Sequence, residues 1–127
     1  MEWVVLTTEE FDAWFEQLTE TQKKRIAVKI DMLELRGPTL RHPDSSDIAG
    51  SRHGGMRELR IQIGGAPFRV LYAFDPNRAA VLLLGGDKTG DERWFEVNVP
   101  KADLLFDRHL ASLEPKEGSR KKGKGNG

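Results

Sequence analysis

A glycine-rich connection between two alternating segments is the feature that most constrains this fold. Residues 57–63 and 68–75 both alternate between apolar and polar side chains, and residues 64–67 (Gly-Gly-Ala-Pro) separate them. This pattern predicts an antiparallel β-hairpin. If Ile63 pairs with Phe68, the apolar side chains all gather on one face, and a slip of one residue would scatter them. That face would hold Leu59, Ile61, Ile63, Phe68, Val70, Tyr72 and Phe74.

The segments before the hairpin predict a strand and two helices. Residues 3–6 are rich in β-forming side chains. A capping box that begins at Thr7 is followed by aromatic and leucine residues at helical spacing, and a second box begins at Thr19. The second helix should end at Gly37, because proline follows and cannot continue it.

The segments around and after the hairpin predict a loop, a strand, a second loop and a helix. Residues 39–55 contain many turn-forming residues, so we expect a loop. Residues 79–84 are wholly apolar and predict a strand in the middle of the sheet. Residues 85–94 predict a polar, glycine-rich loop, and Pro100 favours a last helix that begins near it.

The expected architecture is therefore α+β, with two N-terminal helices packed on a curled antiparallel sheet and a short C-terminal helix. Residues 1–113 form one predicted domain. Residues 114–127 lack aromatic side chains and are rich in glycine, lysine and arginine, which predicts a disordered basic tail.

Composition excludes several classes of protein. The longest apolar run has six residues, too few to span a membrane, and the first residues lack a secretion signal, so we expect a cytoplasmic protein. Cysteine is absent, which removes disulfides and thiolate chemistry. The 20 basic and 20 acidic residues cancel, but residues 1–20 hold six acidic and no basic side chains. The rest of the chain can therefore present a basic surface.

The polar face of the hairpin is the strongest candidate for chemistry. It carries Arg60 and Arg69, which we expect to be exposed, with Glu58 beside them and with Lys88 and Arg93 in the later loop. Arginines on a rigid strand can hold a phosphate through two hydrogen bonds. The three histidines have no metal-ligand spacing, and no nucleotide-binding or zinc motif is present, so we expect neither metal nor cofactor.

Cleavage of RNA without a metal requires a base for the 2′-hydroxyl, positive charge at the phosphate and an acid for the leaving oxygen. Guanidinium groups remain protonated, so the arginines can supply only the charge. Three residues remain open as proton-transfer candidates: Glu58, Lys88 and His53. The candidates for RNA binding are Arg52, His53, Arg57 and Trp94.

Three segments together resemble a known family. They are residues 50–60, which end in Glu-Leu-Arg, residues 67–74 with Phe-Arg-Val-Leu-Tyr, and residues 82–89 with Gly-Gly-Asp-Lys. In residues 3–112 the chain resembles the RelE/HigB-like toxins of the RelE/ParE superfamily, in particular the phage-derived Gp49-like HigB branch. The resemblance implies the toxin of a type II toxin–antitoxin system.

The resemblance also implies an activity, partners and residue roles. The activity would be that of a metal-free, ribosome-dependent mRNA endonuclease, an mRNA interferase that inhibits translation. Its partners would be a helix-turn-helix, HigA-like antitoxin, the ribosome and mRNA. Arg60 would grip the RNA backbone and Arg69 would stabilise the phosphate. Lys88 or Arg93 would match the basic group after the last strand, and Trp94 or Phe95 a catalytic or stacking aromatic.

Two other functions fit the same pattern. One is a ParE-like toxin that binds gyrase without chemistry of its own. The other is a catalytically inactive relative that only binds an antitoxin. Convergence of basic side chains on one concave face would favour the ribonuclease over the gyrase-binding toxin.

Overall fold

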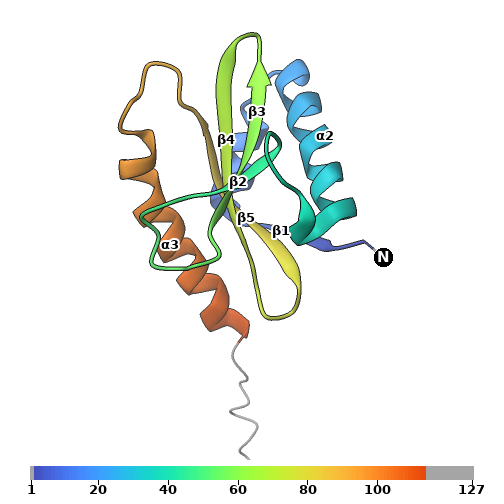
Figure 1. The fold of residues 1–127 in the computed structure, drawn as a ribbon. Coiled ribbons are helices and arrows are strands. Elements are labelled where there is room, and N and C mark those ends of the chain that lie inside the picture. The colour runs from blue at the N-terminus through green and yellow to red at the C-terminus, as the bar shows by residue number, and fades with distance from the viewer. Residues whose placement is uncertain (1, 114–127) are drawn as a thin grey trace, which may run out of the picture.

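The computed structural model describes residues 2–113, so the predicted basic tail of residues 114–127 lies outside the described residues. Five strands form one sheet in the order β1-β5-β4-β3-β2 (Figure 1). The elements in chain order are β1 (Val4–Thr7), α1 (Glu9–Glu16), α2 (Glu20–Arg36), the short 3₁₀ helix η1 (Gly37–Thr39), β2 (Ser45–Asp47), β3 (Arg57–Ile63), β4 (Ala66–Phe74), β5 (Ala79–Asp87) and α3 (Trp94–Leu113).

The α+β class is confirmed, with one correction to the sheet. β2, β3, β4 and β5 are antiparallel neighbours, but β1 pairs with β5 in parallel, so the sheet is mixed. Parallel neighbours need a long connection, and in the chain β1 and β5 are separated by α1, α2, β2, β3 and β4. β5 is internal, as its apolar run predicts, although β4 holds the central place.

The predicted hairpin is present, and its register differs by two residues. Ile63 pairs with Ala66, and Ile61 pairs with Phe68. A shift of two residues preserves which side chains share a face, because the side-chain period is two. The predicted apolar face is therefore confirmed: its residues from Leu59 to Tyr72 are buried in one core.

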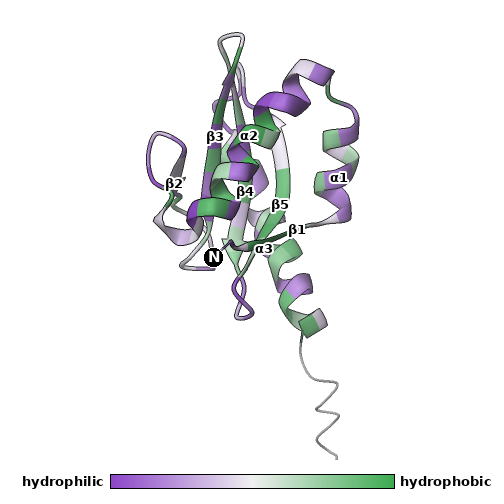
Figure 2. Ribbon diagram, turned by 90° about the vertical axis from the view of Figure 1, so that its right-hand side faces the viewer, coloured by the Kyte–Doolittle hydropathy of each residue, from purple (hydrophilic) through white to green (hydrophobic). Residues whose placement is uncertain are grey.

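Helices cover both faces of the sheet (Figure 1). On one face, α1 and α2 contribute Phe11, Ile26 and Leu33 to the core that contains the apolar side of the hairpin. On the other face, α3 contributes Val99 and Phe106 to a second core. Figure 2 shows hydrophobic residues along β5, between the two helical layers. We call the two sides of the sheet the α2 face and the α3 face.

The N-termini of α1 and α2 can be compared with the two predicted capping boxes. The second capping box is confirmed: Thr19 and Gln22 exchange side-chain and backbone hydrogen bonds at the start of α2. The first is wrong by one residue, because Thr7 still belongs to β1 and Thr8 accepts the hydrogen bond from Phe11 N. α2 ends at Gly37, as predicted, with a positive φ of 54°.

The predicted loop of residues 85–94 is partly wrong, because β5 continues to Asp87. A Cβ atom on Gly85 would lie 2.3 Å from the ring of Trp14, and one on Gly86 would lie 2.7 Å from Trp94 Nε1. The two glycines thus admit a tryptophan on either face of the strand. Close packing, and not a turn, accounts for these glycines.

The last helix is also longer than predicted. α3 begins at Trp94, six residues before the expected start, and it has 20 residues, so it is not short. Trp94 and Val99, which both precede Pro100, are buried. Their burial favours a helix that begins at Trp94 over one that begins at the proline. β2 is a further strand within the predicted loop of residues 39–55. Among residues 2–113, no helix is both long enough and apolar enough to cross a membrane.

Candidate functional site

The hairpin brings two arginines and one carboxylate together on the α3 face. Arg60 pairs directly with Arg69 in the β3–β4 register, so both side chains leave the same face. Glu58 lies between them: Arg60 Nη1 is 3.0 Å from Glu58 Oε2, and Arg69 Nε is 3.1 Å from Glu58 Oε1. Ser46, on β2, donates a further hydrogen bond to Glu58 Oε2. One carboxylate therefore holds two guanidinium groups in place.

Arg69 departs from the expectation of an exposed side chain. The Arg69 and Glu58 side chains are each only 7% exposed, whereas that of Arg60 is 32% exposed. Arg69 Nη1 donates to Phe68 O, but Arg69 Nε and Glu58 Oε1 are not aligned as a hydrogen bond, so each is buried without a hydrogen-bond partner. Burial lowers the pKa of Arg69, the charge of Arg60 lowers it further, and Glu58 offsets part of this effect.

A cleft of about 240 Å³ opens beside these residues, and we call it the basic cleft. Its lining comes from α2, from the segment before β2 and from the hairpin. The lining residues are Arg25, Lys29, Pro43, Arg60, Gln62 and Arg69. Four of the six side chains carry positive charge, so the cleft is suited to an anionic ligand.

Glu58 also lines a second cleft of about 300 Å³, which we call the aromatic cleft. Phe95, at the start of α3, forms one wall, and residues 47–49 form another. Lys88 Nζ lies 5.8 Å from the centre of the Phe95 ring. Because Glu58 pairs with Arg60 and Arg69, the aromatic cleft adjoins the basic cleft through this carboxylate.

Phe95, and not Trp94, is the aromatic ring available at this surface. Trp94 is 6% exposed and lies against Gly86, so its indole fills the core. The two rings meet edge to face, with centroids 5.1 Å apart. Arg93 directly precedes α3, is exposed and donates two hydrogen bonds to Glu96 in the first turn of that helix. It lines neither cleft.

Arg52 and His53 do not join this site. Both contact Asp107, at 2.6 Å and 2.7 Å respectively, in the C-terminal half of α3. Asp107 lies twelve residues beyond Phe95, or about 18 Å along the helix at 1.5 Å per residue. The two residues thus fix the β2–β3 loop to α3, away from Arg60 and Arg69.

Arg57 lies on the α2 face, opposite the site. Its guanidinium is buried and donates to Ser45 Oγ at 3.1 Å, to Tyr72 Oη at 3.3 Å and to Leu40 O at 3.1 Å. It also pairs with Asp47. The sequence analysis names Arg57 as a candidate for RNA binding, but the structure shows that its guanidinium bonds groups within the protein.

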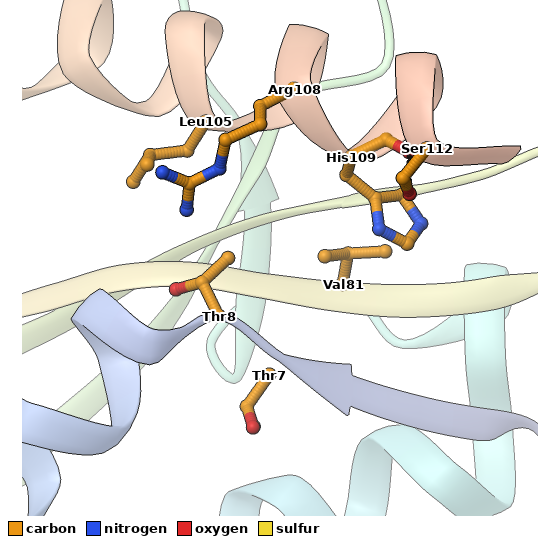
Figure 3. Close-up of a pocket in the computed structure, with 7 residues that line it drawn as sticks. All are labelled: Thr7, Thr8, Val81, Leu105, Arg108, His109 and Ser112. Carbon is orange, nitrogen blue, oxygen red and sulfur yellow. Dashed lines mark hydrogen bonds between the residues drawn. The ribbon is translucent and has the colours of Figure 1, made fainter.

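A separate cleft of about 180 Å³ lies between α3 and β1 (Figure 3). Arg108 and His109 reach from the helix towards Thr8 and Val81 (Figure 3). His109 Nε2 contacts Asp75 Oδ2 at 2.8 Å. Burial opposes ionisation of Asp75, but the bonds from His109 and from two backbone N–H groups outweigh it and lower the pKa of the carboxyl. This pair ties α3 to the β4–β5 turn.

Sequence reasoning missed several residues of the site. Arg25 and Lys29 lie on α2, and nothing in their spacing signals that they face the hairpin edge. Ser46 was missed because β2 has only three residues and reads as loop. Within residues 2–113, no three His, Cys, Asp or Glu side chains come together in a way that could hold a metal ion.

Comparison with known proteins places the chain in a family. A family model described as phage derived protein Gp49-like (DUF891) matches residues 13–107. The chain belongs to the Gp49-like family. Over 109 residues this Gp49-like protein is 40% identical to HigB3 of Mycobacterium tuberculosis, which is named as a toxin; the match covers 85% of this chain and 94% of HigB3. The expected resemblance to HigB toxins is confirmed.

Three further comparisons extend this assignment. Over 120 residues the Gp49-like chain is 38% identical to HigB2 of the same organism, covering 91% of this chain but 60% of HigB2. The isolated E. coli RelE toxin shares its fold with a TM-score of 0.54 at 14% identity, over 74% of this chain and 93% of RelE. RelE in the Pyrococcus horikoshii RelE–RelB complex gives 0.52 at 20% identity, over 69% and 97%. The Gp49-like protein is thus a HigB-like toxin with the RelE fold.

Proposed function

We propose that this protein is the toxin of a type II toxin–antitoxin system and that it cuts messenger RNA on the ribosome without a metal. The observation that carries the proposal is the placement of Arg60 and Arg69 on one face, around Glu58 and between two clefts. Convergence of basic side chains on one concave surface favours a nuclease over a toxin that only binds gyrase.

Arg60 and Arg69 supply the charge that the reaction needs. When the 2′-oxygen attacks, negative charge grows on the two non-bridging oxygens of the phosphate. Fixed guanidinium groups stabilise that charge without rearranging, because strands and Glu58 hold them before the substrate arrives. Arg60 is exposed enough to contact the phosphate first, and Arg69 acts from beneath it.

Proton transfer falls to Glu58 and Lys88, since His53 lies with Asp107 on the far part of α3. Glu58 is the carboxylate beside the phosphate-binding arginines, and it takes the 2′-hydroxyl proton. Lys88, whose Nζ lies 5.8 Å from the centre of the Phe95 ring, gives a proton to the leaving 5′-oxygen. The Phe95 ring offers a surface on which a base can stack.

The same proposal includes an antitoxin partner. The Pyrococcus horikoshii neighbour was solved as a RelE–RelB complex, and the M. tuberculosis relatives carry the HigB name. We therefore expect a HigA-like antitoxin with a helix-turn-helix domain. Co-expression of the adjacent open reading frame should give a complex that co-purifies and abolishes toxicity.

A purified translation system tests the nuclease proposal. Wild-type protein should cut a translated message at defined positions, seen by mapping transcript 5′ ends, and should leave the same RNA intact without ribosomes. Arg60→Ala should lower cleavage roughly 100-fold, because it removes one charged donor from the phosphate.

The matched control is Arg36→Ala, which removes an exposed arginine from the last turn of α2, outside both clefts. It should cut at the wild-type rate. Growth arrest with inhibited gyrase and uncut transcripts would overturn the nuclease proposal in favour of a gyrase-binding toxin. Equal cleavage by Arg60→Ala and wild type would remove the site.

A further inference from the structure

We infer that the basic cleft is a second phosphate subsite, in which α2 holds the RNA strand next to the phosphate that is cut. This inference rests on the proposed function and deepens it. Its residues are Arg25 and Lys29, which come from a helix on the opposite face of the sheet from the candidate catalytic groups and meet Arg60 and Arg69 at the edge of β3.

The two α2 side chains are held towards the hairpin. Arg25 Nη2 donates to Gln62 O at 2.7 Å, a contact that spans from the helix to β3. Lys29 Nζ pairs with Asp44, whose backbone oxygen in turn accepts from Arg60 N. The lysine is thus fixed beside the hairpin edge, and little side-chain freedom remains to be lost when a ligand binds.

The cleft has more positive than negative charge. Its four cationic side chains face two carboxylates, those of Glu58 and Asp44, which leaves two charges in excess. Within residues 2–113, Arg25 bonds only a neutral carbonyl and no carboxylate reaches it. An anion that entered the cleft would balance this excess.

A buried donor gives independent support for a ligand. Arg69 lines the basic cleft, its side chain is 93% buried, and its Nε lies 3.1 Å from Glu58 Oε1 without the alignment of a hydrogen bond. Buried polar groups are nearly always paired, so this misaligned contact leaves donor capacity for an anion at the wall of the cleft. Burial lowers the pKa of Arg69 and the charge of Arg60 lowers it further, whereas a phosphate oxygen would favour the charged form.

The ligand that fits is a phosphodiester chain, not a single small anion. The basic cleft and the aromatic cleft adjoin through Glu58, so anion-binding and base-stacking surfaces follow one another. This arrangement matches single-stranded RNA, in which phosphates alternate with nucleosides whose bases can stack. The strand would cross from Phe95, past Arg60 and Arg69, to α2.

Binding to an RNA that cannot be cut tests the subsite apart from catalysis. The probe is a single-stranded octanucleotide with a 2′-O-methyl group at every position, titrated into the full chain at several salt concentrations. The variant is Arg25→Gln with Lys29→Gln, in which the new amides keep hydrogen-bond donors but carry no charge. The control, Lys23→Gln with Lys24→Gln, removes two charges from the same helix outside the cleft.

We expect the cleft variant to bind roughly tenfold more weakly at low salt. Its slope of log affinity against log salt should fall by about 0.7 for the phosphate lost, and that of the control should stay near the wild-type value. Equal slopes in the two variants, or no binding by wild type, would overturn the subsite. If the slopes differ as expected but the wild type cuts no message, the subsite stands and the nuclease proposal fails.

Discussion

Two buried arginines on the same hairpin differ in how their donors are used. Arg57, on the α2 face, is surrounded by acceptors: two hydroxyls, a backbone carbonyl and the carboxylate of Asp47. Arg69, on the α3 face, has one well-formed hydrogen bond, and its Nε lies 3.1 Å from a carboxylate that it shares with Arg60 without the alignment of a hydrogen bond.

The difference separates an arginine that stabilises the fold from one that we propose binds a ligand. All three nitrogen atoms of the Arg57 guanidinium have acceptors within the protein. A buried guanidinium with fewer acceptors costs stability in the free protein, and an anion that binds it offsets this cost. Exposure does not distinguish the two, since both are buried; the count of acceptors does.

The largest effect should come from Arg57→Ala. It removes hydrogen bonds from a charged group to buried acceptors and leaves a cavity, so we expect the free energy of unfolding to fall by about 3 kcal/mol. Urea denaturation measures this, with Arg36→Ala as the control that changes it by less than about 0.5 kcal/mol. The folded Arg57→Ala protein should bind the methylated octanucleotide like wild type. Weaker RNA binding at wild-type stability would reverse the comparison.

Arg69→Gln should show the opposite pattern. We expect message cleavage to fall roughly 100-fold, which corresponds to about 2.7 kcal/mol in the activation barrier. Part of any lost stability would come from Glu58, which keeps only Arg60 as a cationic partner.

Urea denaturation separates the two consequences of losing Arg69. Glu58 and Arg60 remain as an ion pair in Arg69→Gln, so we expect the free energy of unfolding to fall less than in Arg57→Ala. If stability fell as far as in Arg57→Ala, Arg69 would act through the fold alone.

Asp75 is a buried carboxylate whose two oxygens both have partners, so it extends the comparison of buried charged groups to acidic side chains. Its side chain is 1% exposed, Oδ1 accepts from the backbone N–H groups of Asn77 and Ala79, and Oδ2 contacts His109. Because folding lowers its pKa, the ionised form contributes stability above the ordinary carboxyl pKa of about 3.9. That contribution disappears as the pH falls through the lowered value in the folded protein.

Asp75→Asn should therefore cost about 1 kcal/mol at pH 7, because the charge-assisted bond to His109 is lost. The gap between variant and wild type should narrow below about pH 4, as measured by urea unfolding at several pH values. A gap that stayed constant or grew on acidification would show that ionised Asp75 does not stabilise the fold.

The sequence was most informative where periodicity acts. Alternation in the hairpin correctly placed Arg60 and Arg69 on one face and Leu59 on the other, although the predicted register was wrong by two residues. Local chemistry likewise predicted the capping box at Thr19 and the end of α2 at Gly37.

Tertiary packing decided what the sequence did not show. The sequence of Gly85 and Gly86 is typical of a loop, but in the structure their lack of side chains makes room for two tryptophan rings. No local sequence pattern indicates this packing. The burial of Arg69 and the approach of Arg25 and Lys29 depend on how α2 and the hairpin meet in space. Residues from three separate segments form that cleft, so only the folded chain defines it.

Arg93 should show the smallest effect. It is exposed and pairs with Glu96 in the first turn of α3, and an exposed pair of this kind contributes less than about 1 kcal/mol. Arg93→Ala should thus change neither the free energy of unfolding by more than about 0.5 kcal/mol nor cleavage by more than roughly threefold. Lys88→Ala is the matched comparison, since Lys88 lies over Phe95. If Arg93→Ala lost more cleavage than Lys88→Ala, the number of acceptors around a cation would not predict how much an exposed cation contributes to cleavage. The comparison of Arg57 with Arg69 would then hold for buried arginines alone.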